Sequence, residues 1–354
     1  MCDVFLMAGE KSGDLHGAAL IEKILNENPS ASIAGVAGAS MRALPIECVL
    51  RTECLMVMGF LDILPALPRL TYFFYKIRKA ILKKNPKKVI LIDYAEFNLL
   101  LARSLRKSGY EGEIVQYICP TVWAWRKSRI KTMAKYLDEV QCILPFEPKC
   151  FEGTGLKATY VGHPLIAEKQ KTTYDPKWRK KLPSKEILAI FPGSRTKEIK
   201  RNLPIQLRVA KQLQEKYDLQ PIVSCAHAKY LRLILKANKD NFPIVDVRHT
   251  HNLMHDAKLA IATSGTVTLQ LALYKVPTAV VFAIRRIDQF IAQRLLRIDL
   301  PHYALPNIIA NKRIYPEFYG TNLKEKDLLA SLENLYQKKL SNADGLNLVA
   351  ARCR

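Results

Sequence analysis

Two segments in the second half of the chain share a pattern that strongly restricts its fold. Residues 187–199 are ILAIFPGSRTKEI, and residues 258–273 are KLAIATSGTVTLQLAL. Each is an apolar run suited to a buried parallel strand, followed by a turn of small residues and then by a helical pattern. Glycine lets the backbone approach an anion, and free N–H groups at a helix start favour a phosphate there. The two turns therefore predict a nucleotide site.

Strand and helix patterns alternate along the whole chain. The first half contains the strand patterns VFLMAG, ASIAGVAG, KKVILIDY, GEIVQYIC and EVQCILPF, and the second half contains ILAIFPGS, PIVSCAH, FPIVDV, LAIATSG and TAVVFAI. This alternation predicts an α/β fold with two doubly wound, Rossmann-like domains. We place the domains at residues 1–166 and 187–310, with a polar linker near 166–186. A C-terminal helical segment follows at 311–354, where residues 324–336 have a helical rhythm.

Composition indicates a globular protein of a reducing compartment. The chain has 354 residues, of which 49% are hydrophobic, enough for sizeable cores. Its eight cysteines include no CxxC pair, and several lie inside apolar strands, so we interpret them as buried thiols. The chain opens on the strand pattern CDVFLMAG, without a basic leader, and we expect a cytoplasmic protein.

Positive charge is concentrated beside an apolar stretch. The 55 Lys+Arg residues exceed the 32 Asp+Glu residues and give a net charge of +23, which attracts polyanions. Residues 55–75, LMVMGFLDILPALPRLTYFFY, precede seven basic residues between positions 76 and 88. We interpret this pair of segments as a peripheral membrane contact, the alternative being a loop packed on its own core. It is too short and interrupted to span a bilayer. The candidate contact residues are Met58, Phe60, Leu61, Ile63, Leu64 and Leu67.

The N-terminal half has a different turn and a candidate base. Gly9, Gly13 and Gly17 do not have the spacing of the dinucleotide fingerprint G-x-G-x-x-G, and acidic residues in the turn would repel a pyrophosphate. We therefore expect this turn to face a neutral sugar or hydroxyl. Asp93, in IDYAEFN, follows a predicted strand, where the ligand crevice of an open α/β sheet lies. It is a candidate general base, although such a residue commonly caps a helix.

Several motifs occur in an order and spacing that resemble the lipid-A-disaccharide synthase family. They are AGEKSGDLHG, VMGF, IDYAEFN, CPTVWAWR, VGHP, FPGSRTKEI, SGTVTLQ and LPNIIA, between about residues 3 and 320. The resemblance implies a GT-B fold of two facing Rossmann-like domains and an inverting glycosyltransferase. It also implies the substrates UDP-2,3-diacylglucosamine and 2,3-diacylglucosamine 1-phosphate, joined by a β(1→6) bond with release of UDP. The implied enzyme acts at the cytoplasmic face of the inner membrane, needs no metal or other cofactor, has no nucleic-acid partner, and allows a homodimer.

The resemblance also assigns roles to residues. Asp93 matches the family's essential aspartate and would remove the proton of the acceptor 6-hydroxyl. Arg195 would stabilise the charge that builds on the leaving phosphate, and Glu10 is a secondary catalytic candidate that would hold an acceptor hydroxyl. The expected UDP-sugar residues are Ser194, Arg195, Ser264, Gly265, Thr266, Gln270 and Asn307. The expected acceptor or cleft residues are Ser12, Asp14, Glu96, Asn98, Trp125 and Arg126.

Two departures from the family and two rival functions stay open. The family tends to carry Gln near Gly320, where this chain has Gly-Thr-Asn. The family usually has Glu where this chain has Gln270, which can still hydrogen-bond ribose hydroxyls. Another UDP-GlcNAc enzyme, of the muramyl-peptide GlcNAc transferase or UDP-GlcNAc 2-epimerase type, would be expected to lack VWAWR. A basic nucleic-acid-binding protein would be expected to spread its lysines along a groove.

Histidines and tryptophans offer weaker signals. His251 and His255 are spaced to share a helix face and could hold a metal together with His249, but no acidic or cysteine ligand is evidently paired with them. We therefore expect them to be structural or exposed. For Trp123 and Trp125 we expect one ring in the core and the other shaping the cleft.

Overall fold

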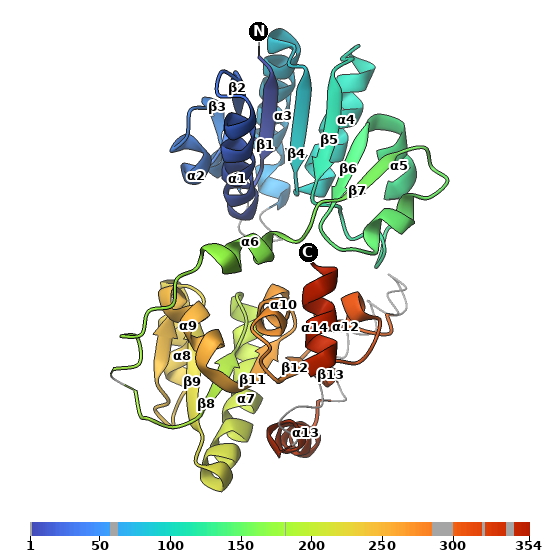
Figure 1. The fold of residues 1–354 in the computed structure, drawn as a ribbon. Coiled ribbons are helices and arrows are strands. Elements are labelled where there is room, and N and C mark those ends of the chain that lie inside the picture. Colours follow the sequence, from blue (N-terminus) through green and yellow to red (C-terminus); the bar gives the residue numbers. More distant parts are fainter. Residues whose placement is uncertain (1, 57–62, 181, 285–299, 321–322, 338–342) are drawn as a thin grey trace. The chain divides into compact units, whose positions relative to one another are not determined.

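The chain folds into two units, each built around one parallel sheet. The computed structural model describes residues 2–56, 63–180, 182–284, 300–320, 323–337 and 343–354. The units are Met1–Pro164 and Leu165–Arg354. In each unit, helices cover both faces of the sheet (Figure 1). The predicted α/β class follows from the same alternation of buried strands and amphipathic helices.

The sheet of the first unit has seven strands in the order β3-β2-β1-β4-β5-β6-β7. The strand patterns predicted in this half are confirmed, and two short edge strands, β3 and β7, were not predicted because they contain exposed polar residues. The strands are β1 (Val4–Ala8), β2 (Ile33–Ala37), β3 (Glu47–Arg51), β4 (Lys88–Ile92), β5 (Glu113–Tyr117), β6 (Glu139–Cys142) and β7 (Lys157–Tyr160). The strand order reverses between β1 and β4, which creates a switch point there.

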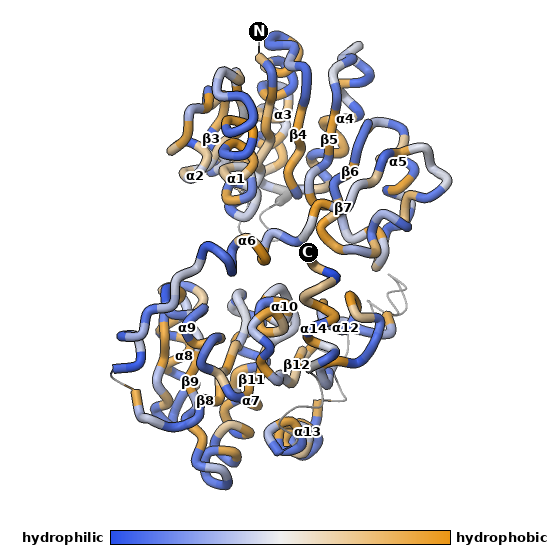
Figure 2. Tube along the Cα trace, viewed as in Figure 1, coloured by the Kyte–Doolittle hydropathy of each residue, from blue (hydrophilic) through white to orange (hydrophobic). Residues whose placement is uncertain are grey.

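Successive residues of each central strand enter different cores. Phe5 and Met7 of β1 pack in the cluster that also contains Ile77, whereas Leu6 packs in the cluster that contains Ile21. Burial on both faces explains why these strands are continuous apolar runs, drawn mostly orange in Figure 2. The helices of this unit are α1 (Lys11–Glu27), α2 (Ala39–Arg42), α3 (Ile63–Lys84), α4 (Ala95–Lys107) and α5 (Arg129–Tyr136), with the 3-10 helices η1 (Thr52–Cys54) and η3 (Glu147–Phe151).

Helix α3 corrects one expectation about the apolar and basic segments. The prolines led us to expect that a core helix is unfavourable here, yet α3 contains Pro68 and buries Ile77 and Ile81 completely. An internal proline costs about 3 kcal/mol, whereas burying each isoleucine contributes about 1.5–3 kcal/mol. Burial therefore outweighs the proline. Leu67 and Tyr72 on the same helix are exposed, so one face packs on the core and another is open to solvent.

The sheet of the second unit has six strands in the order β10-β9-β8-β11-β12-β13. Its predicted strands are confirmed, and the short β13 was not predicted. The strands are β8 (Ile187–Phe191), β9 (Gln220–Cys225), β10 (Ile244–Asp246), β11 (Ala257–Thr263), β12 (Thr278–Phe282) and β13 (Glu317–Tyr319). The helices are α6 (Pro164–Lys171), α7 (Thr196–Tyr217), α8 (Leu231–Ala237), α9 (Thr250–Asp256), α10 (Thr266–Leu273), α12 (Leu305–Ala310), α13 (Glu325–Gln337) and α14 (Ala343–Arg352), with η4 (Ala228–Tyr230) and η5 (Val247–His249). The strand order reverses between β8 and β11.

Two further expectations change in this unit. Residues 166–186 are not a free linker: Trp178 is buried, and its indole N–H donates to Asp256 at 2.9 Å. The predicted tail helix is observed as α13, but the fold does not end on it. Helix α14 follows, buries Val349 and packs against α10 and α12. Its contact supports α10, the helix that opens on one of the two predicted phosphate turns.

Candidate functional site

Two predicted catalytic carboxylates meet at the switch point of the first sheet. Glu10 follows β1 and Asp93 follows β4, and β1 and β4 are paired in parallel from Val4 and Lys88 to Ala8 and Ile92. The carboxyl ends of parallel strands lie at one edge, so the residues that follow them are neighbours. The side chains of Glu10 and Asp93 are hydrogen-bonded to each other. Glu10 and Asp93 are more than eighty positions apart in the sequence, so the sequence alone could not predict this contact.

The environment of Asp93 favours its protonated form. Burial is the main cause, and the hydrogen bond and negative charge of Glu10 act in the same direction, so that the pKa of Asp93 rises to about 7. A carboxyl group with a pKa near the working pH can accept and return a proton, as a general acid or base must. The pair therefore has the chemistry of an acid–base site.

Strained backbone holds Asp93 in place. Asp93 and Tyr94 have φ values of 48° and 38°, in the left-handed region that non-glycine residues rarely adopt. Two buried amides hold the Asp93 carbonyl: Asn98 donates to it at 2.8 Å and Gln116 at 2.9 Å. Asn98, expected to face the acceptor, is fully buried and instead positions Asp93. Gln116 was missed, and the signal that could have identified it is a polar residue inside the apolar strand EIVQY.

Asp14 also has a structural position rather than the expected cleft position. Its buried carboxylate accepts from the backbone N–H groups of Ser40 at 2.8 Å and Met41 at 3.0 Å, and so caps α2. A side chain at Gly38 would lie 2.4 Å from the Asp14 carboxyl carbon, which explains the glycine. Ser12, in the same N-terminal turn, is exposed.

A second group of expected acceptor residues gathers at the first turn of α4, the helix that follows Asp93. Glu96, in the first turn of α4, forms ion pairs with Arg126 and Arg129. The guanidinium carbons of these arginines lie 4.5 Å and 5.2 Å from the ring centre of Trp125. These contacts bring Glu96, Trp125 and Arg126 together, and they add Arg129, which the sequence motifs did not indicate. The cluster places two cations close to one exposed carboxylate.

The expected nucleotide turns lie at the switch point of the second sheet. β8 ends before Ser194 and Arg195, and the neighbouring β11 ends before Ser264 and Gly265. Gly265 caps α10 with a φ of 157°, and apart from its chain neighbours no atom of the described residues lies within 4 Å of where its Cβ would be. Thr266, the first residue of α10, is exposed. The structure thus brings both turns to one sheet edge, each at a helix N-terminus.

One turn differs from the expectation of free N–H groups. The Ser194 N–H donates to Glu198 Oε2 at 3.0 Å, and the largely exposed Arg195 side chain pairs with Glu198 Oε1 at 2.7 Å. Glu198 therefore occupies the position in which an anion was expected. Sequence reasoning missed its role, although a glutamate in the third position of a predicted helix is a capping signal. The contact shows that this turn accepts a negatively charged group.

The remaining expected nucleotide residues have different environments. Asn307 is fully buried: its Oδ1 accepts from the N–H groups of Ile314 and Tyr315, each at 2.8 Å, and its amide donates to the Tyr315 carbonyl. It holds the loop after α12 and does not face an open edge. Gln270 is half-buried on α10.

The histidines expected to be structural or exposed have separate partners. The ring of His251 contacts the Tyr274 hydroxyl and Glu168, whereas His255 contacts Asp256. Trp123 donates its indole N–H to Glu147, so it also has a structural contact. These contacts indicate that each ring packs against residues of its own unit.

The candidate membrane residues are only partly described. Met58, Phe60 and Leu61 lie outside the described residues. For Ile63 and Leu64 the structure describes the helical backbone but not the side chains. Leu67 is 47% exposed on α3. Among the helices in the described ranges, none combines the length and apolar character required to cross a bilayer.

Comparison with known proteins identifies one family. The family model described as lipid-A-disaccharide synthetase matches residues 4–347. The chain is 39% identical to the lipid-A-disaccharide synthase of Chlamydia muridarum, over 97% of this chain and 58% of that protein. It is 40% identical to the Chlamydia pneumoniae synthase, over 89% and 53%, and 33% identical to that of Geobacter sulfurreducens, over 89% and 82%. The chain thus spans between half and three-fifths of the length of the two chlamydial relatives.

Solved structures support the fold. The glycotransferase of kitacinnamycin has a TM-score of 0.65 at 11% identity, over 99% of this chain and 94% of that one. The UDP-GlcNAc 2-epimerase of Methanocaldococcus jannaschii, solved with UDP-GlcNAc and UDP, has a TM-score of 0.58 at 14% identity, over 99% and 98%. At such identities the similarity concerns the fold alone. The predicted class, GT-B with two Rossmann-like parallel α/β domains, is confirmed.

The carboxylate pair leads to a testable prediction about the pKa of Asp93. We expect the pKa of Asp93 in the folded chain to be about 7, and a Glu10→Gln substitution to lower it, because the neighbouring negative charge is removed while burial remains. The folded chain binds this proton more tightly than the unfolded chain, so this group's contribution to stability is lost as pH rises from 3.8 toward about 7. Carboxyl NMR of selectively labelled protein measures the pKa, with the exposed Glu27→Gln variant as control. An Asp93 that titrates near 4 in the wild type would contradict the paired arrangement.

Proposed function

We propose that this chain, which belongs to the lipid-A-disaccharide synthetase family, is an inverting glycosyltransferase of lipid A biosynthesis. It joins UDP-2,3-diacylglucosamine to 2,3-diacylglucosamine 1-phosphate by a β(1→6) bond and releases UDP. Family membership supports the reaction. The single observation that supports the chemistry is the hydrogen-bonded pair of Asp93 and Glu10 at the switch point of the first sheet.

The carboxylate pair supplies the base. Deprotonated Asp93 takes the proton of the acceptor 6-hydroxyl as the oxygen attacks the anomeric carbon of the donor sugar. The bond from that carbon to the UDP oxygen breaks on the opposite face, which inverts the configuration, and its electron pair leaves with UDP. A positioned base of this kind contributes about 10²–10⁴-fold to the rate. Glu10 keeps the pKa of Asp93 high, so that the conjugate base is strong enough to accept the proton.

The second unit supplies the nucleotide site in this proposal. The diphosphate replaces the Glu198 carboxylate at the Ser194 N–H and at the Arg195 guanidinium, both of which already bind a negative group. The open N-terminus of α10, at Gly265, offers further N–H groups. Fixed donors of this kind stabilise the charge that develops on the leaving phosphate.

The arginine cluster of the first unit fits the acceptor phosphate. Arg126 and Arg129 are held close together by Trp125 and by the shared carboxylate of Glu96. Guanidinium groups bind phosphate oxygens in a bidentate manner, and a doubly charged phosphate competes effectively with one exposed carboxylate. Since Glu96 lies three residues after Asp93, a phosphate bound here keeps the acceptor near the base.

The exposed face of α3 fits a membrane surface. Tyr72 and Tyr75 are exposed, and Lys76, Lys79 and Lys83 follow at helical spacing and are exposed as well. Aromatic rings followed by cations suit the boundary between acyl chains and anionic headgroups. Because both substrates are acylated, such a contact gives access to them.

The reaction is tested by product formation in detergent micelles. We expect wild-type protein to form disaccharide and UDP, Asp93→Asn to reduce kcat by about 10²–10⁴-fold, and Arg195→Ala to reduce it by about 10²-fold or more. The exposed Arg232→Ala variant, on α8, is the control and should leave turnover unchanged. Circular dichroism checks that each variant is folded. Full activity of Asp93→Asn would refute its assignment, whereas epimerisation of UDP-GlcNAc without disaccharide would indicate the epimerase alternative.

The phosphate assignment is tested with two acceptors, one with and one without the 1-phosphate. Losing charge-assisted bonds worth about 1.5–3 kcal/mol should raise the KM of Arg126→Ala or Arg129→Ala for the phosphorylated acceptor by about 10- to 100-fold. The KM for the acceptor without phosphate should change little. Arg103→Ala, an exposed arginine on α4, is the matched control. Equal effects on both acceptors would show that the arginines support structure and do not bind the phosphate.

The membrane contact is tested by flotation with vesicles that contain or lack anionic lipid. Replacing Lys76, Lys79 and Lys83 by Glu should weaken binding to anionic vesicles by more than about 100-fold, since each lysine contributes about 1 kcal/mol. Binding of the wild type should also fall with added salt. Replacing the exposed Lys229, Lys236 and Lys239 of the second unit by Glu is the matched control. Equal wild-type binding to neutral vesicles would contradict the proposal.

A further inference from the structure

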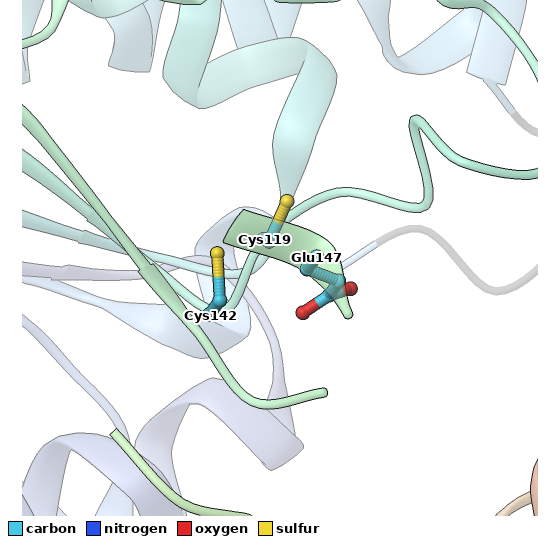
Figure 3. Close-up of side chains that lie close together, drawn as sticks. All are labelled: Cys119, Cys142 and Glu147. Atoms are coloured by element: carbon cyan, nitrogen blue, oxygen red, sulfur yellow. The ribbon is translucent and has the colours of Figure 1, made fainter. Parts of the chain in front are cut away.

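Three side chains that can bind a metal ion converge near the carboxyl ends of β5 and β6 in the first unit. Cys119 lies just after β5, Cys142 ends β6, and Glu147 begins η3. β5 and β6 pair in parallel, with Tyr117 opposite Gln141 and the Ile118 N–H bonded to the Gln141 carbonyl at 3.0 Å, so the two cysteines are brought together. The sulfur and carboxylate atoms of the three residues all lie within 4.8 Å of one another (Figure 3).

The group is enclosed by protein. The exposed fractions are 4% for Cys119, 0% for Cys142 and 1% for Glu147. One Glu147 oxygen accepts from the N–H groups of Ile143 and Leu144, at 3.1 Å and 3.0 Å, and the other accepts from the Trp123 indole at 3.3 Å. These donors fix the direction of the carboxylate.

Among the described side chains, the buried Glu147 carboxylate has hydrogen-bond donors but no basic partner. In the part of the chain that the structure describes, no lysine or arginine forms an ion pair with Glu147. Buried charges in proteins are paired or bind metal ions. The two neighbouring sulfur atoms are soft ligands, which favour zinc over magnesium or calcium.

We propose that Cys119, Cys142 and Glu147 bind one zinc ion. Zinc takes thiolate ligands at about 2.3 Å and carboxylate oxygens at about 2.0–2.2 Å, which places ligand atoms roughly 3.3–3.8 Å apart in a tetrahedral site. The observed separations, up to 4.8 Å, require the ligand atoms to approach one another by up to about 1.5 Å. Two thiols lose their protons on binding, so the ion and its three anionic ligands leave one net negative charge.

The buried position indicates a structural ion rather than a catalytic one. Zinc at this point joins the ends of β5 and β6 to η3. It fixes the start of the loop 118–128, which contains Trp125 and Arg126. The Trp123 indole already links the loop to the Glu147 carboxylate. Loss of the ion should therefore loosen the acceptor side of the first unit before it affects the second unit.

The test uses the full chain without a histidine tag, prepared metal-free under reducing conditions and then loaded with zinc or cobalt(II). We expect about one zinc per chain after removal of loosely bound metal, and a thiolate-to-cobalt absorption band of a tetrahedral site. Cys119→Ser and Cys142→Ser should each remove the band and lower the bound zinc at least about tenfold. Cys225→Ser, which changes a buried cysteine at the end of β9 in the second unit, should retain both.

Measurements on the wild-type chain keep the proposal testable if a cysteine variant does not fold. Zinc should protect Cys119 and Cys142 from alkylation, as measured by mass spectrometry, and should raise the melting temperature. Zinc content no higher than that of a protein without such a site, or a cobalt spectrum without a thiolate band, would overturn the proposal. A disulfide between Cys119 and Cys142 in protein that has been purified with reductant would overturn it as well.

Discussion

Parallel pairing of the strands is the constraint on which the rest of this structure depends. In both sheets the chain builds outward in one direction, returns to the centre and continues in the other direction, so the order reverses between β1 and β4 and between β8 and β11. Loops at the carboxyl ends diverge at such a reversal and leave room for a ligand. Glu10 with Asp93, and Ser194 with Gly265, lie at these two positions because of the strand order.

At the first reversal, the pKa of Asp93 depends on its burial and on the neighbouring Glu10 carboxylate. Both effects raise the pKa of Asp93, and the left-handed backbone at Asp93 and Tyr94 keeps the side chain in that environment. Such strain persists only where neighbouring groups hold it. Here the buried amides of Asn98 and Gln116 hold the Asp93 carbonyl.

Several polar residues that resemble ligand contacts in the sequence support the backbone instead. Asp14 caps α2, Asn98 binds the Asp93 carbonyl, and Asn307 closes the loop after α12. Buried N–H and C=O groups need partners, and a short polar side chain at the end of a strand or helix can supply one. A motif therefore contains both the residues that meet a substrate and those that keep them in place. Sequence pattern does not separate the two kinds.

The sequence by itself determined the two α/β domains, the buried central strands and the sheet-edge positions of Asp93, Ser194 and Gly265. Apolar periodicity and turn chemistry are local properties, so the pattern is enough to predict them. Tertiary structure alone decided that Glu10 hydrogen-bonds Asp93, that Glu198 fills the turn at Ser194, and that Cys119 meets Cys142. It also decided that β3, β7 and β13 complete the sheets, since short edge strands are formed by pairing more than by their own residues. Contacts of this kind depend on strand register, side-chain direction and burial, which arise only when distant segments pack together.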